Sequence, residues 1–479
     1  MSPRSAQDER GNAADLQLRC VEPIRGSSLL KEAAVNGQAG HARNRRRLGL
    51  QVGCVLLIGT AATVASSTQA GAAATTLSVD GANPACSDAG SGSAAPFCTI
   101  KHAAKVATAG QTVIVSAGTY AGDITPAFSG TSTAPITFVV GPGADVTVKG
   151  GTDGFKVSSR SWIVIDGFNV TATTGAGIYL SSSTNVTVTR DHVSYAGLPK
   201  SGSTARGIRL SGTSNSTVSH NTTDHNSDAG IALSGTSNAN VVTGNLSFAN
   251  ARGYTRAAAG FDLRDGTGNV VTSNVSHDNE DSGYNIWTGT SGALVSDNVS
   301  YKNGDHGIDI HNATNAAIVA NTVTSNVDSG IEMTTSTGTH LANNIATDNG
   351  INSPRTSGNL RADSASISST TTDFDLVSLR VPGVMIDWAG TKYSTLAAFQ
   401  AATGREPHGI GAAPLFVASA TGDFHLAAGS PGIDAADSAT FGQPALDADG
   451  FARVDDPATL NTGSGPVTYA DRGAYEYQP

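Results

Sequence analysis

Acidic side chains recur at nearly regular intervals in the middle of this chain. Asp262 and Asp309 each take the third position of a Gly-apolar-x-apolar segment, and Asn285 takes it in the segment between them. Two carboxylates on neighbouring turns of one scaffold can share glycoside cleavage, because one can protonate the leaving oxygen while the other activates water. Asp262, Asp309 and the nearby Asp281 are therefore candidate catalytic residues.

Side chains suited to holding a sugar surround this acidic series. Trp287 could stack on a sugar ring, and arginines could form paired hydrogen bonds with sugar carboxylates. His306 or His311 could adjust proton transfers. An insertion over residues 249–256 adds further cations and a tyrosine. The candidate substrate-binding residues are Arg252, Tyr254, Arg256, Arg264, Asn285, Trp287, His306 and His311.

A second acidic group comes just before these segments. Asp281 and Asp305 each stand two residues ahead of the glycine of their segment, and Glu280 adjoins the first. Carboxylates from successive turns, together with backbone carbonyls, would form an oxygen-rich site that suits calcium. The alternative is that a solvent-facing turn favours aspartate, as at Asp228. Asp281, Asp305 and Glu280 are the candidate metal ligands, and calcium is the candidate cofactor.

The elements that position these residues belong to a repeat. Seven Gly-apolar-x-apolar segments lie between Gly177 and Met333, and their glycines are 23, 24 or 30 residues apart. Short strands separated by Asn and Gly turns at this period are typical of a parallel β-helix, in which each coil buries its apolar face only by stacking on its neighbours. The sequence therefore predicts an all-β fold, a right-handed parallel β-helix solenoid with an N-terminal cap and an irregular C-terminal region.

Two columns of asparagine keep the same register. We interpret them as turn residues that tolerate left-handed backbone and stack in ladders. The columns are Asn221, Asn245, Asn274, Asn298, Asn321 and Asn344, and Asn226, Asn250, Asn279, Asn303, Asn326 and Asn349.

Strand geometry places the candidate residues on the outside of the solenoid. Side chains alternate along a strand, so the apolar pair of each segment faces the interior and the x residue faces solvent. Adjacent coils lie about 4.8 Å apart, which predicts an exterior line through Asp262, Asn285 and Asp309. The two aspartates would then stand about 9–10 Å apart between strands, near the carboxyl separation of inverting glycosidases.

The chain divides into four predicted parts: a leader over 1–75, an N-terminal cap with the first coils over 76–160, regular repeats over 161–350, and C-terminal coils with a cap over 351–479. Residues 99–107 predict a short amphipathic helix over the first coil, and residues 396–402 a second helix. The regular period is lost after Asn349, so we expect the residues beyond it to cap the far end.

The leader predicts export. A basic stretch at 43–47 precedes an apolar run from Val52 to about Ala65, and small residues up to Ala74 suit signal-peptidase cleavage. We expect a secreted, extracellular protein without stable membrane association after cleavage. Cys86 and Cys98 remain in the mature chain and would pair in an oxidising compartment.

Charge and architecture also limit the partners. The formal net charge of −10 argues against a nucleic-acid partner, which would require a basic face. A capped solenoid needs no second subunit, so we expect a monomer.

Several segments resemble the family-nine pectate lyases and their bacterial β-helix relatives. The resemblance is carried by residues 251–254, Gly260-Phe-Asp-Leu263, residues 277–284 and residues 303–309, and by the tail segments 429–434 and 473–477. It implies a right-handed β-helix that acts on a polysaccharide. In those lyases four aspartates hold calcium and a lysine abstracts a proton before β-elimination.

This chain departs from the family pattern at the reactive positions. Ala259 stands where a calcium aspartate precedes Gly-Phe, and the segment from Asp281 to Asn285 keeps one aspartate of three. Asp309 stands at the lysine position. We therefore expect a lyase, hydrolase or epimerase acting on an extended glycan that could contain uronate. The alternative is a non-catalytic glycan-binding or cell-surface structural β-helix.

Overall fold

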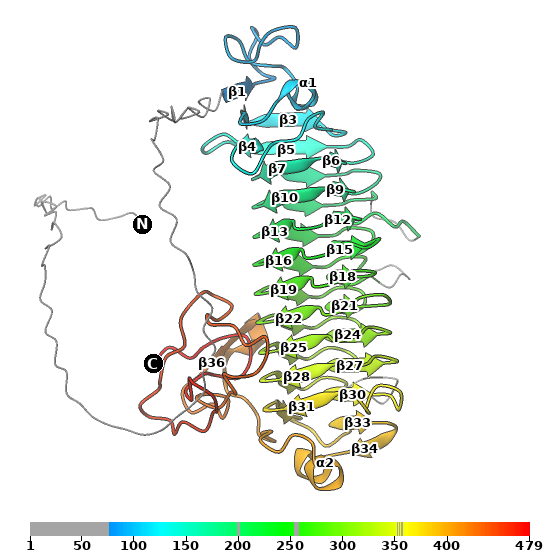
Figure 1. Cartoon of the computed structure of the whole chain (residues 1–479), viewed down its shortest axis with the longest axis vertical. Helices are drawn as coiled ribbons and strands as arrows, with labels where there is room; N and C mark the ends of the chain where they lie inside the picture. The colour runs from blue at the N-terminus through cyan, green and yellow to red at the C-terminus, as the bar shows by residue number, and fades with distance from the viewer. Residues whose placement is uncertain (1–75, 199–201, 253–257, 352, 354, 356–357) are drawn as a thin grey trace, which may run out of the picture. The chain divides into compact units, whose positions relative to one another are not determined.

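The computed structural model describes residues 76–479, apart from 199–201, 253–257, 352, 354 and 356–357. These residues wind through three long sheets that form a right-handed parallel β-helix (Figure 1). Sheet A contains β1 (Thr76–Val79), β2 (Thr112–Val115), β4 (Ile136–Val140), β7 (Ser161–Asp166), β10 (Thr184–Thr189), β13 (Thr217–Ser219), β16 (Val241–Thr243), β19 (Val270–Thr272), β22 (Leu294–Ser296), β25 (Ala317–Val319), β28 (His340–Ala342) and β31 (Thr371–Asp373).

Sheets B and C complete each coil. Sheet B contains β3 (Gly118–Ala121), β5 (Val146–Lys149), β8 (Asn169–Thr171), β11 (His192–Ser194), β14 (Thr222–Asp224), β17 (Leu246–Phe248), β20 (Val275–His277), β23 (Val299–Tyr301), β26 (Thr322–Thr324), β29 (Ile345–Thr347) and β32 (Leu376–Ser378). Sheet C contains β6 (Phe155–Ser158), β9 (Ile178–Ser181), β12 (Ile208–Ser211), β15 (Ile231–Ser234), β18 (Phe261–Leu263), β21 (Tyr284–Ile286), β24 (Ile308–His311), β27 (Ile331–Thr334), β30 (Leu360–Ala362), β33 (Ile386–Trp388) and the antiparallel β34 (Thr391–Tyr393).

The apolar pair of each repeated segment forms the core, as predicted. Phe261 and Leu263 of β18 are buried and align with Tyr284 and Ile286 of β21. The Phe261 and Tyr284 rings stack with centroids 4.8 Å apart. Each coil thus buries its apolar side chains against equivalent side chains of the coils above and below.

The asparagine columns form buried ladders, as predicted. Asn274 Nδ2 donates to Asn298 Oδ1 at 3.0 Å and to the Val242 carbonyl at 2.9 Å. The Asn274 backbone N–H also donates to Asn298 Oδ1 at 3.0 Å, and Asn274 Oδ1 accepts from Asn245. Each amide therefore satisfies backbone groups that the turn leaves without a β-sheet partner.

The prediction that these asparagines are left-handed is wrong. The residue with positive φ is the one just before each ladder asparagine, such as Ser273 before Asn274 (φ 56°) and Asp278 before Asn279 (φ 52°). The left-handed residue turns the chain, and the asparagine that follows can then point its amide along the solenoid axis.

The longer repeats place their extra residues at one corner. In each 30-residue interval, the extra residues belong to the connection from a sheet B strand to the following sheet C strand. The two longer connections run from β11 to β12 and from β17 to β18. The ladder remains in register across the second insertion, because Asn250 Nδ2 still donates to Asn279 Oδ1 at 2.9 Å.

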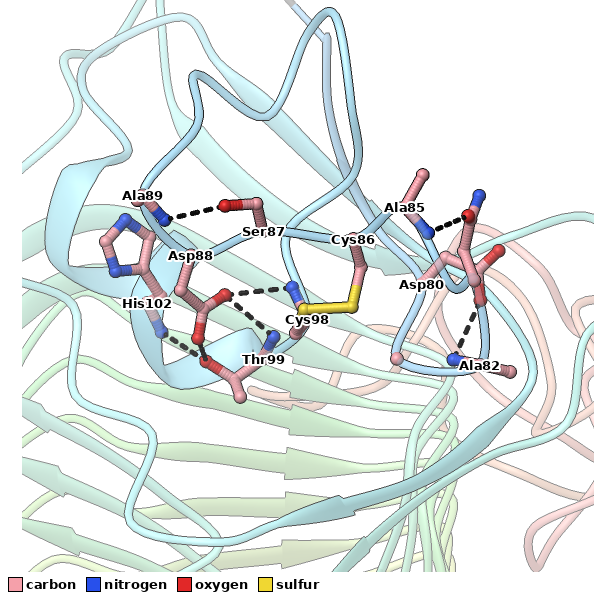
Figure 2. Close-up of a disulfide and its surroundings, with 12 residues drawn as sticks. Asp80, Ala82, Ala85, Cys86, Ser87, Asp88, Ala89, Cys98, Thr99 and His102 are labelled. Carbon is pink, nitrogen blue, oxygen red and sulfur yellow. Dashed lines mark hydrogen bonds between the residues drawn. A yellow bond between two sulfur atoms is a disulfide. The ribbon is translucent and has the colours of Figure 1, made fainter.

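The N-terminal cap contains the predicted helix and disulfide. Helix α1 (Ile100–Val106) begins after Thr99, whose side chain accepts from the His102 backbone N–H at 3.1 Å. Cys86 and Cys98 form a disulfide, and Asp88 beside it accepts from the backbone N–H groups of Cys98 and Thr99 (Figure 2). Ile100 and two alanines of α1 are buried over the first coil.

The solenoid continues beyond the point where the sequence period fades. Strands β30 to β33 add further coils after Asn349. The second predicted helix is α2 (Leu396–Thr403), at the end of the coils (Figure 1). Its buried Phe399 packs edge-on against Trp388.

The rest of the C-terminal region lies along the side of the coils, where we had expected an end cap. It includes β35 (Phe416–Ala418), the 3-10 helix η1 (Ser419–Thr421) and β36 (Asp423–Leu426). Phe424 packs against Tyr301 of sheet B, and the Gly473 N–H donates to the Asn343 carbonyl at 2.7 Å. Among the described residues no helix has the length and apolar character required to cross a membrane.

We predict that Asn274→Ala lowers the free energy of unfolding by about 1–3 kcal/mol, because it leaves buried donors and acceptors without partners. Urea denaturation followed by circular dichroism would measure the change. Asn461→Ala, at an exposed position of the C-terminal region, is the matched control and should change little. Equal effects of the two substitutions would contradict the structural role of the ladder.

Candidate functional site

The predicted column of polar residues forms on the outer side of sheet C. The Cα register pairs Asp262 with Asn285, Asn285 with Asp309, and Asp309 with Glu332. Their neighbours along each strand belong to the apolar core, so alternation turns these side chains away from it. The structure therefore confirms that residues one period apart align on a single face.

The prediction that this column faces open solvent is wrong. Asp262 is 3% exposed and Asp309 is 8% exposed. Arg264 covers Asp262, donating from Nε to its two carboxylate oxygens at 2.9 and 3.0 Å. The Arg264 guanidinium also lies 4.4 Å from the Trp287 ring centroid, and Trp287 Nε1 donates to Asp309 Oδ2 at 2.8 Å. Arg264 thus covers Asp262 of its own segment, and Trp287 contacts Asp309 of the next segment.

Asp262 is held by two arginines. In addition to Arg264, the guanidinium of Arg206 lies 3.8 Å from its Oδ2. Burial raises the pKa of Asp262, and the Arg264 and Arg206 cations oppose that rise. A carboxylate in this arrangement is better suited to fixing the arginines than to exchanging protons with a substrate.

Asp309 has the strongest features of a proton donor in the column. Burial raises its pKa to about 7, the Trp287 hydrogen bond lowers it, and the negative charge of Asp281 raises it. Burial also raises the pKa of Asp281, and the nearby Asn285 side chain lowers it. The structure therefore brings three predicted residues, Asp281, Asn285 and Asp309, within electrostatic reach of one another.

Glu280 adds another carboxyl with a high proton affinity. Burial and the charge of Asp281 raise the pKa of Glu280 to about 7, while Arg252 lowers it. Its Oε2 accepts from the Ala258 backbone N–H at 3.3 Å. Near neutral pH, Glu280 and Asp309 can therefore both bind and release protons.

Potential metal ligands gather one coil further along. Among the described residues, the carboxylates of Asp305 and Asp328 and the imidazole of His306 have ligand atoms within 4.8 Å of one another. Burial, with the cation of Arg361 nearby, lowers the pKa of His306 to about 3, so its ring is neutral at neutral pH. Of the predicted ligands, this group includes Asp305 but neither Asp281 nor Glu280.

This group does not fit calcium as it stands. The guanidinium of Arg355 forms ion pairs with both Asp305 and Asp328, so a protein cation already neutralises them. A neutral imidazole is also a ligand for transition metals more than for calcium, which prefers oxygen. We therefore assign no step of the chemistry to a calcium ion.

The remaining predicted residues have varied positions. His311 is exposed, its Nδ1 lies 2.8 Å from Thr334 Oγ1, and its ring is 5.9 Å from that of Trp287. Arg252 is exposed, 3.8 Å from Asp278 Oδ1. Tyr254 and Arg256 lie outside the described residues.

Sequence reasoning missed the arginines that neutralise the acids. Arg361 aligns with Glu332 and forms an ion pair with it. It follows Gly358 at an altered spacing, Gly-Asn-Leu-Arg, which hid it from a search for Gly-apolar-x-apolar. Arg206 lies immediately before Gly207, outside the strand positions we considered, and it pairs with Asp262 and Asp228.

Comparison with known proteins agrees with this architecture. Residues 82–357 match the protein family described as the Pel9A-like, right-handed β-helix region. The crystal structure of pectate lyase Pel9A is similar, with a TM-score of 0.52 and 16% identity over 85% of this chain and 98% of that chain. The complex of XylC with xylose has a TM-score of 0.51 and 13% identity over 63% of this chain and 75% of that chain. No curated protein matches the chain.

We predict that Asp309→Asn stabilises the fold at alkaline pH. The pKa of Asp309 is about 4 in the unfolded chain and about 7 in the folded protein. Its protonated carboxyl therefore favours the folded state most below about pH 4, and this contribution to stability is lost as the pH rises to about 7. At pH 8 the substitution should raise the free energy of unfolding by about 1–3 kcal/mol, and at pH 4 it should change it little. Urea melts at both pH values measure this, and an equal effect at both would contradict the buried, proton-binding state.

A second prediction concerns the bridging guanidinium. Removing it in Arg355→Ala leaves Asp305 and Asp328 free to bind a cation, so calcium or manganese should raise the melting temperature of the variant by a few degrees. A ligand at a hundred times its Kd contributes about 2.7 kcal/mol. Arg380→Ala, which removes a 3.2 Å pair with Asp348, is the control. An equal shift in the unaltered protein, or none in the variant, would contradict this assignment.

Proposed function

Because the chain belongs to the Pel9A-like right-handed β-helix family, we propose that it cleaves an extended polysaccharide bound along the outer face of sheet C. The observation that carries the proposal is Asp309, a buried carboxyl with a pKa of about 7 in a column of polar residues. An acid of this strength can donate a proton to a glycosidic oxygen at neutral pH.

Hydrolysis is the reaction that these residues support best. Asp309 would protonate the leaving oxygen as the bond from the anomeric carbon breaks, and Asp281 would take a proton from the water that attacks that carbon. Return of the Asp281 proton to solvent and reprotonation of Asp309 would complete the cycle. Elimination is less well supported, because Asp309 stands at the position where the family's lyases have their lysine base.

Two neighbouring groups would orient the substrate. Asn285 Oδ1 is buried and accepts no hydrogen bond within the described part of the chain, so it could accept one from a sugar hydroxyl. Trp287 is half-buried beside Asp309, and its outer edge would contact a sugar ring.

The cellular setting is part of the same proposal. The leader and the Cys86–Cys98 disulfide support secretion, and we propose that the mature chain works outside the cell as a monomer on a polysaccharide. Calcium would enter the Asp305 group only after Arg355 moves away.

Non-catalytic glycan binding is the second candidate. It is favoured by the ion pairs of Asp262 and Glu332 with arginines, which make part of the column structural. Binding without new reducing ends or unsaturated products would support this role and contradict catalysis.

We predict that Asp309→Asn lowers turnover by about 10²–10⁴-fold, the usual contribution of a general acid. A panel of acidic and neutral polysaccharides, with calcium or with a chelator, would be followed by reducing-end formation and by absorbance of unsaturated uronate. Activity of the unaltered protein should fall as the pH rises through about 7, because Asp309 must be protonated. The control is Asp145→Asn, at an exposed position. Full activity of Asp309→Asn would remove this residue from the mechanism.

A further inference from the structure

The acidic group one coil beyond Asp281 contains a buried histidine. His306 is 6% exposed, and its Nε2 lies 3.5 Å from Asp305 Oδ1. Asp328 comes from the following coil, is 2% exposed, and has a carboxylate oxygen within 4.8 Å of the ligand atoms of the other two residues. Its backbone N–H donates to the Asp305 carbonyl at 2.9 Å, so the pairing of the coils fixes the spacing of the two aspartates. Two carboxylates and an imidazole therefore converge from successive turns.

The Glu332 carboxylate lies behind the His306 ring. Its Oε2 is 3.0 Å from His306 Nδ1, accepts from the Ser329 hydroxyl at 3.1 Å, and belongs to a carboxylate that also pairs with Arg361. A carboxylate beside one ring nitrogen favours the tautomer protonated there, and this pairing usually supports a metal-bound imidazole. Among the described residues, Nδ1 is buried and has no partner with hydrogen-bond geometry. The lone pair on Nε2 is therefore directed to the two aspartates.

The Arg355 guanidinium neutralises this group only in part. It forms ion pairs with both Asp305 and Asp328, yet its side chain is 58% exposed. Two carboxylates against one guanidinium leave a negative charge, whereas a dication would balance both. Ion pairs of an exposed arginine are weak because water competes for both partners. A metal ion can therefore replace the guanidinium at small cost.

We propose that Asp305, His306 and Asp328 bind a transition-metal dication such as Zn²⁺, which displaces the Arg355 guanidinium into solvent. Zinc accepts imidazole nitrogen together with carboxylate oxygen, whereas calcium selects oxygen ligands. Three protein ligands leave a fourth position for water. Because the ligands come from two successive coils, the ion also cross-links those coils. This inference goes beyond polysaccharide cleavage and does not depend on it, since Asp309 is not a ligand.

The test is a titration of the chelator-treated full chain with Co²⁺, followed by visible absorption, with Zn²⁺ affinity measured by displacement of the bound Co²⁺. His306→Ala should weaken binding of both ions by tenfold or more, and Glu332→Gln by about 10–100-fold. Arg355→Gln should tighten binding by tenfold or more, because the competing cation is gone. His408→Gln, which removes an exposed imidazole 2.8 Å from Asp373, is the control and should leave the affinity unchanged.

The outcomes test each part of the inference. Equal Co²⁺ affinity in the unaltered and His306→Ala proteins, or displacement of Co²⁺ from the unaltered protein by an equal concentration of Ca²⁺, overturns the transition-metal site. Binding in the Arg355→Gln protein alone overturns displacement of the arginine. Circular dichroism checks the fold, and Arg355→Gln, at an exposed side chain, keeps the test decisive if His306→Ala is unfolded. None of these results measures glycan turnover, so failure here and failure of the proposed cleavage are distinguishable.

Discussion

Hydrogen bonding between successive coils is the constraint on which the rest of this structure depends. Each strand pairs in register with the equivalent strand one coil away, and the asparagine ladders extend this pairing through the turns. A side chain at a given repeat position is therefore held one strand spacing from its counterpart. The core and the polar column both follow from that fixed register.

Register brings like charges together, and the site shows how the protein accommodates them. Arginines from the same strand or from neighbouring turns neutralise Asp262, Asp305, Asp328 and Glu332. Burial raises the pKa of Asp309 to about 7, and among the described residues it receives an indole N–H but forms no ion pair. The raised pKa of Asp309 thus arises because this carboxyl is buried without full charge compensation.

The sequence predicted the repeat, the register and the faces of the strands because these depend on spacing alone. Asp262, Asn285 and Asp309 align as the period of 23 or 24 residues requires. Exposure could not be derived in this way. It depends on side-chain contacts, such as Arg264 over Trp287, that no periodicity encodes.

The departures from prediction share this cause. The bridging role of Arg355 depends on a turn outside the repeat pattern, and the lateral course of the C-terminal region depends on contacts such as Phe424 with Tyr301. The left-handed residues before the ladder asparagines vary in type, from Ser273 to Lys302, so their composition gave no signal.

The extra residues of the longer coils have a wider consequence. In the two 30-residue intervals they enter between sheets B and C, and the ladder across the second of them keeps its pairing. Chain can therefore be gained or lost at that corner without moving the column. The connections at that corner and the polar column of sheet C can therefore change independently of one another in sequence and length.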